Sequence, residues 1–114
     1  MEAYKRGLRI FEPQGAAHRF DILIQGAKGY RRVQIKGTTQ KRCVRILCGV
    51  GAKRKLNREA YDILALYSET YDIWYIIPSE KIVSSSVSIY PMYPQGEGPG
   101  YYEKYREQWT LLNE

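Results

Sequence analysis

Two short stretches of the chain are rich in β-branched and other apolar residues, which alternate with polar residues in the second stretch, and a glycine-containing link separates them. The stretches are Phe20–Ile24 and Val33–Gly37, and Gly26 and Gly29 lie in the link. Alternation with β-branched residues is typical of strands, and closely spaced glycines are typical of turns. The pattern therefore predicts an antiparallel β-hairpin, with its second strand running from about Tyr30 to Lys36.

Pairing across this hairpin would gather polar side chains on one face. If Gln25 pairs with Tyr30 around a four-residue turn, antiparallel register puts Asp21 opposite Gln34. Because side chains alternate along a strand, Gln34 and Lys36 share that face. A carboxylate, an amide oxygen and an ammonium group would then meet at the end of the hairpin. Such a patch could hold a divalent cation and place a lysine beside a phosphate.

The remaining apolar stretches predict more short strands. They are Leu8–Phe11, Val44–Leu47 as a third strand of the sheet, Tyr61–Tyr67, Asp72–Ile77 and Ser84–Tyr90. Periodicity alone leaves Tyr61–Tyr67 open between a buried strand and part of a helix. The strand-like run that follows it, across the turn-forming residues Ser68–Tyr71, favours a second hairpin.

Helical signals are short and occur at three places in the chain. Glu2–Arg6 reads as the last turn of a helix that Gly7 ends. Pro78 would start a short helix with Ser79 as a possible cap. A loop follows from Pro91 to Gly100, and the spacing of aromatic and apolar residues predicts a helix over Tyr102–Leu112.

The size of the chain and its cysteines exclude several classes. A chain of 114 residues with 44% hydrophobic residues forms one domain, here residues 1–114, with one modest core. No apolar run approaches the roughly 18 residues of a membrane span, and the N-terminus has no apolar signal core. We therefore expect a cytoplasmic protein with no membrane partner. Cys43 and Cys48, with a single histidine, make no zinc set and are expected to be reduced.

Positive charge is segregated along the chain. From Ile22 to Arg58 there is no Asp or Glu, although the net charge of the whole chain is only +6. This acid-free segment holds Lys28, Arg31, Arg32, Lys36, Lys41, Arg42, Arg45, Lys53, Arg54, Lys55 and Arg58. Segregation of this kind indicates a polyanionic partner, with nucleic acid as the preferred one and simple solubility as the alternative. The expected phosphate contacts are Arg31, Arg32, Lys41, Arg42, Lys53, Arg54 and Lys55.

Four stretches in this order carry a family resemblance. They are Phe20–Ile24, Arg32–Gly37, Tyr61–Tyr67 and Asp72–Pro78. Between about Tyr4 and Ile82 the chain resembles the PD-(D/E)XK nuclease superfamily, and it is most similar to the endonucleases associated with group I introns. In that branch a glutamine stands in the usual acidic position of the motif. The resemblance implies an α/β (mixed α+β) fold with a restriction-endonuclease-like core, a central mixed sheet whose hairpin carries the active site, and short flanking helices.

The resemblance also implies an activity, which is hydrolysis of DNA phosphodiesters with Mg²⁺ or Mn²⁺. It makes Asp21 the metal-binding aspartate, Gln34 the second metal ligand and Lys36 the catalytic lysine. The family's first helix supplies a glutamate well upstream of the glycine that matches Gly7, so we expect a truncated first helix here. Glu2 and Glu12 are the possible accessory residues.

Two further function classes stay open. One is a nucleic-acid-binding protein of the same fold without catalysis, and the other is a structural or assembly protein. Branched DNA, as for a junction resolvase, is an alternative substrate. Cutting both strands of a duplex favours a homodimer or higher homo-oligomer. Residues 91–114, with Tyr90 just before them, would supply the subunit contact through Tyr90, Tyr93, Tyr101, Tyr102 and Tyr105.

Overall fold

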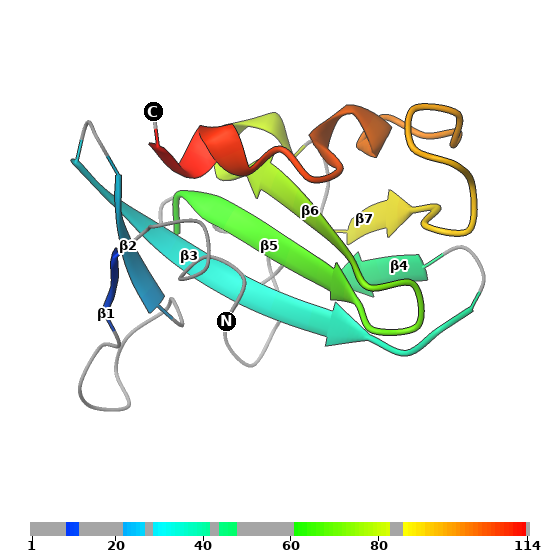
Figure 1. Ribbon diagram of the computed structural model, residues 1–114, viewed down its shortest axis with the longest axis horizontal. Helices are drawn as coiled ribbons and strands as arrows, with labels where there is room; N and C mark the ends of the chain where they lie inside the picture. The colour runs from blue at the N-terminus through cyan, green and yellow to red at the C-terminus, as the bar shows by residue number, and fades with distance from the viewer. Residues whose placement is uncertain are drawn as a thin grey trace.

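A mixed five-stranded sheet forms the centre of the protein (Figure 1). The computed structural model describes residues 9–11, 22–26, 29–41, 44–47, 61–82 and 86–113. The central strands, in spatial order, are β1 (Arg9–Phe11), β2 (Ile22–Gly26), β3 (Gly29–Thr38), β5 (Ile63–Ser68) and β6 (Ile73–Pro78). A separate two-stranded sheet consists of β4 (Val44–Leu47) and β7 (Ser86–Ile89). The described helices are short 3₁₀ turns, η1 (Ser79–Lys81), η2 (Glu103–Tyr105) and η3 (Trp109–Asn113).

The predicted first hairpin is confirmed, with the predicted register. Gln25 pairs with Tyr30, and Ile22 pairs with Val33. Pairing continues to Gly26 opposite Gly29, so the turn is tighter than four residues. Gly29 has φ +130°, a conformation that residues with a Cβ rarely adopt. β3 continues two residues beyond the predicted end because its last residues pair with β5.

The second predicted hairpin, β5–β6, is also confirmed. Ser68 pairs with Ile73 and Leu64 pairs with Ile77 in antiparallel register, while β5 runs parallel to β3. Side chains on both faces of β5 are buried, which explains why its sequence is continuously apolar rather than alternating. The prediction that Val44–Leu47 joins the same sheet was wrong, because β4 pairs only with β7 among the described strands.

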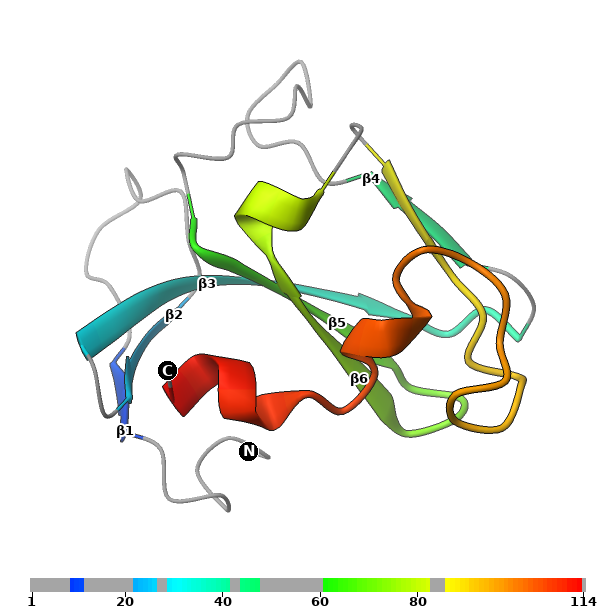
Figure 2. The same cartoon turned by 90° about the horizontal axis from the view of Figure 1, so that it is seen from above.

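Each face of the central sheet is covered by a different layer. Figure 2 shows η3 on one side, and η1 with the β4–β7 pair on the other. The first core contains Ile22, Ile24, Val33, Ile63, Ala65, Ile76, Trp109 and Leu112. The second core contains Tyr61, Leu64, Leu66, Tyr75, Ile77, Ile82, Val87, Ile89, Tyr102 and Tyr105. Two layers of short elements therefore enclose one twisted sheet.

The predicted continuous helix over Tyr102–Leu112 was wrong, although its inward face was correct. Tyr105, Trp109 and Leu112 are all buried. Two 3₁₀ turns replace the helix because the chain extends at Arg106, which bridges to Tyr75, and Glu107 adopts φ 54°. This segment passes around the edge of β6, so η2 meets one face of the sheet and η3 the other.

The structure differs from two other local predictions, the Ser79 cap and the exposure of the C-terminal tyrosines. Ser79 does not cap η1, because Pro78 occupies the cap position and no side-chain cap bond forms. Of the tyrosines predicted to cover a subunit contact, Tyr102 and Tyr105 are buried in the chain's own core, while Tyr93 and Tyr101 are 44% and 48% exposed. In the part of the chain that the structure describes, no helix is both long and apolar enough to cross a membrane.

Candidate active site

The candidate site lies on β3, where Gln34 and Lys36 share one face of the sheet. Val33 points into the opposite core with 1% exposure. Strand alternation therefore turns the even-numbered side chains away from that core. Gln34 pairs with Leu64 and Lys36 with Leu66 across the parallel ladder, and both polar side chains are half-buried. The sequence-predicted amide and ammonium groups are thus brought together.

Several of the predicted site residues lie outside the part of the chain that the structure describes. Asp21 lies outside the described residues, immediately before Ile22 in the chain. So do the other predicted contributors Glu2, Glu12, Arg42, Lys53, Arg54 and Lys55, the thiols Cys43 and Cys48, and the predicted helical turn Glu2–Arg6. Within the described ranges, no three His, Cys, Asp or Glu side chains gather as a metal site.

Arg32 and Asp62 form a bidentate ion pair beside these residues. Arg32 Nε and Nη2 donate to Asp62 Oδ2 and Oδ1 at 3.2 and 3.1 Å. The Arg32 backbone N–H also donates to Oδ2 at 2.8 Å, and the Asp62 N–H donates to the Arg32 carbonyl at 2.8 Å. Arg32 precedes Gln34 by two residues, so its side chain lies on the same face of β3.

The pair changes the acidity of its carboxylate. Partial burial alone would raise the pKa of Asp62, but the hydrogen bonds and positive charge of Arg32 outweigh burial and lower it. Sequence patterns did not single out Asp62 as a site residue. Its partner lies 30 residues away, across a parallel strand pair that periodicity does not reveal.

Arg31 and Lys41, two of the predicted phosphate contacts, do not belong to this row. Arg31 pairs with Ile24 and so belongs to the opposite face, and its Nη1 donates to the Tyr30 carbonyl at 3.2 Å. Lys41 is exposed, and its carbonyl accepts a bond from the Tyr71 hydroxyl at 2.7 Å. A pocket of about 320 Å³ opens where β5 begins. Its lining residues are Tyr30, Arg31, Asp62, Ile63, Pro78, Ser79, Glu80 and Leu111.

A comparison with solved structures supports the fold. A bacterial homing endonuclease, I-Ssp6803I, superimposes on 98% of this chain and 83% of its own, with a TM-score of 0.70 and 17% identity. The chain shares the fold of that structure. At this identity the likeness concerns the fold alone. No family model and no curated protein sequence matches the chain.

Proposed function

We propose that this protein is a metal-dependent endonuclease that hydrolyses phosphodiester bonds in DNA. The observation that carries the proposal is the placement of Gln34 and Lys36 side by side on one face of β3, within a fold shared with a homing endonuclease. The acid-free basic segment that surrounds this strand supports a polyanionic substrate. In finer detail, we propose a PD-(D/E)XK nuclease of the group I intron-associated branch, with a restriction-endonuclease-like core, acting in the cytoplasm.

In this proposal Asp21 and Gln34 hold the metal. The Ile22–Val33 pair supports this assignment, since Asp21 is the next residue in the chain and Gln34 follows Val33. A carboxylate and an amide offer the oxygen donors that Mg²⁺ prefers, and Mg²⁺ commonly keeps several waters and binds substrate phosphate as well. Glu2 and Glu12 are proposed as accessory acidic residues. When bound, the ion would supply a more acidic water and neutralise charge on the phosphate.

Lys36 supplies the positive charge nearest to the proposed reaction. Its ammonium group orients the attacking water or stabilises the negative charge that builds on the phosphate oxygens. The oxygen of water attacks phosphorus, the bond from phosphorus to one ester oxygen breaks, and a proton passes to that leaving oxygen. Gln34 is neutral, so the proposed site holds its metal with less negative charge than two carboxylates would provide.

Substrate binding and assembly are part of the same proposal. Arg31, Arg32 and Lys41, with Arg42 and the cluster Lys53–Lys55, contact DNA phosphates. A homodimer or higher homo-oligomer would present two sites to the two strands of a duplex. In the described part of the C-terminal segment, Tyr93 and Tyr101 are exposed aromatic residues available to such a contact.

A plasmid assay tests the proposal. Purified protein with Mg²⁺ should nick or linearise supercoiled DNA, and chelation, Lys36→Ala or Asp21→Asn should abolish the reaction. Lys104→Ala is the matched control, because Lys104 is an exposed lysine of the C-terminal segment. Absence of cleavage on plasmid and branched DNA with metal present would overturn the nuclease reading. Salt-sensitive binding without cleavage would favour the non-catalytic DNA-binding alternative.

A further inference from the structure

Three hydrogen bonds hold Arg32 against the Asp62 carboxylate, although both side chains are accessible to water. The two side chains are 39% and 38% exposed, and an ion pair this accessible to water contributes little to stability. The ladder from Val33–Ile63 to Thr38–Ser68 already fixes β3 against β5. Register therefore does not depend on a guanidinium fixed in one orientation.

Fixing an arginine side chain costs conformational entropy, but it also prepares the guanidinium to bind a ligand. A free arginine loses rotamer entropy when it is held in place. Here Asp62 holds the guanidinium before any ligand arrives, and a ligand that binds it does not incur that cost again. Among the described residues, the donors of Nη1 have no acceptor, while Nε and Nη2 are bound to Asp62. The guanidinium therefore keeps donors for an external anion.

The position of Arg32 determines which anion it would meet. Side chains on one face of a strand recur about every 6.6–6.8 Å, so Arg32, Gln34 and Lys36 form an evenly spaced row. We propose that Arg32 binds a DNA phosphate that neighbours the one being hydrolysed, and that Asp62 is a positioning residue that orients Arg32 for it. This inference rests on the proposed nuclease function, and it separates Arg32 from the other basic residues by its fixed orientation.

The proposal and overall charge predict different effects of Asp62→Asn on turnover. Asp62→Asn removes one negative charge beside the site, so simple electrostatics predicts tighter DNA binding. If Asp62 orients Arg32, the same change slows turnover, and the loss of that preorganisation opposes the electrostatic gain in binding. A role in stability alone would change neither kcat nor the salt dependence of binding once the variant is folded.

Binding and cleavage are therefore measured separately on five variants. Affinity for a labelled 30-base-pair duplex is measured by anisotropy in EDTA between 50 and 200 mM KCl. Cleavage by the same proteins is then measured with Mg²⁺ at saturating DNA. Circular dichroism and urea unfolding establish that each protein is folded. The variants are Arg32→Met, Arg32→Lys, Asp62→Asn and the matched controls Lys104→Met and Glu97→Gln, both at exposed positions.

We expect Arg32→Met to lower the slope of log affinity against log salt by about 0.9, the value for one phosphate contact. Arg32→Lys should keep that slope but lower kcat about tenfold, because lysine lacks the planar fork. Asp62→Asn should lower kcat about tenfold with affinity unchanged or tighter. The two control variants should match the wild-type protein in slope and kcat.

Two results would overturn the inference. An unchanged salt slope in Arg32→Met would show that Arg32 does not contact a phosphate. An unchanged kcat in both Asp62→Asn and Arg32→Lys would show that Asp62 does not position Arg32 for turnover. Failure of the nuclease proposal is distinguishable, because the wild-type protein would then cleave no DNA. The inference would in that case be decided by the slope of Arg32→Met alone.

Discussion

The carboxylate of Glu107 accepts a hydrogen bond from the Trp74 N–H at 3.0 Å, and the Glu107 N–H donates to the Trp74 carbonyl at 2.8 Å. β6 is the last strand of the central sheet, so these bonds occupy an edge that another strand could otherwise pair with. The second carboxylate oxygen accepts from Trp109 Nε1 at 3.1 Å. One residue thus joins the sheet edge to η3.

We expect Glu107→Ala to destabilise the protein by about 2 kcal/mol, since it leaves partly buried donors on both tryptophans without their acceptor. Glu107→Gln should lose less, because an amide oxygen still accepts one bond. Urea unfolding followed by tryptophan fluorescence measures both, and Glu97→Ala is the control at an exposed glutamate. Equal stability of Glu107→Ala and the control would contradict the assignment.

The acid stability of the protein should depend on Asp62. Its pKa is lowered in the folded state, so its contribution is present above the unfolded value of about 3.9 and is lost as pH falls through the folded value. Both partners are more than a third exposed, which limits the contribution to about 1 kcal/mol. Urea unfolding should show wild type more stable than Asp62→Asn at pH 7, with the gap narrowing as pH falls below about 3.9. A gap independent of pH would refute this prediction.

The charge of the proposed metal site can be increased by one substitution. Gln34→Glu supplies a second carboxylate, and we expect the Mg²⁺ concentration for half-maximal cleavage to fall severalfold. A metal titration of plasmid nicking measures the change. Gln95→Glu adds the same charge in an exposed loop and should leave the titration unchanged. If both variants shift the titration equally, the effect is one of net charge and not of coordination.

The Tyr75 hydroxyl is buried without a hydrogen-bond partner among the described residues, and burial raises its pKa to about 12. Tyr75→Phe removes this polar group while keeping the ring, over which the Arg106 guanidinium lies at 5.5 Å. We expect a variant as stable as wild type, or more stable by up to about 1 kcal/mol.

Alkaline pH provides a second measurement on the same variant. A folded pKa above the ordinary value of about 10 means that stability is lost as pH rises from 10 towards 12. Tyr75→Phe should lose less stability than wild type between pH 9 and 11 in urea unfolding. A variant markedly less stable at pH 7 would instead indicate that the hydroxyl makes a stabilising bond.

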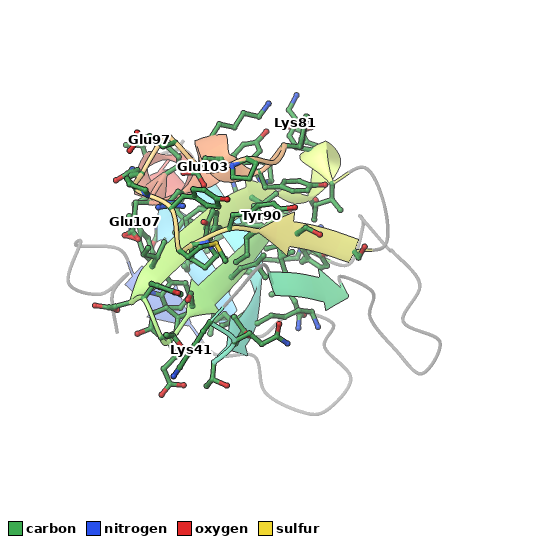
Figure 3. All side chains as sticks on the ribbon, turned by 90° about the vertical axis from the view of Figure 1, so that its right-hand side faces the viewer. Lys41, Lys81, Tyr90, Glu97, Glu103 and Glu107 are labelled. Carbon is green, nitrogen blue, oxygen red and sulfur yellow. The ribbon has the colours of Figure 1, made fainter. Side chains whose placement is uncertain are left out.

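The contacts of Arg106 in the C-terminal segment could not be predicted from local sequence patterns. Its guanidinium donates to the carbonyls of Tyr93 and Tyr90 at 2.7 and 3.0 Å, and to Glu103 Oε1 at 2.8 Å. Glu103 and Tyr90 lie near each other in Figure 3, away from Lys41. The spacing of buried side chains predicted the inward face, but these contacts replace a continuous helix by two short turns. The spacing of apolar residues along the chain does not predict such hydrogen bonds.

The hairpin register was predictable because its information is local. The glycines around the turn and the alternating strands fix which residues pair, and the structure has Gln25 opposite Tyr30 as expected. The Arg32–Asp62 pair was not predictable, because it requires β5 to lie parallel to β3. Alternation assigns a strand but not its neighbour, which also explains why β4 was placed in the wrong sheet.

β3 is bonded on both sides, to antiparallel β2 and parallel β5. Inserting or deleting one residue within it would exchange its two faces, so that Gln34 and Lys36 would enter the apolar interior and Val33 would leave it. Natural variants of this protein should therefore conserve the length of this strand strictly. Gains and losses of residues would accumulate in the connections between strands, where they leave the face with Gln34 and Lys36 intact.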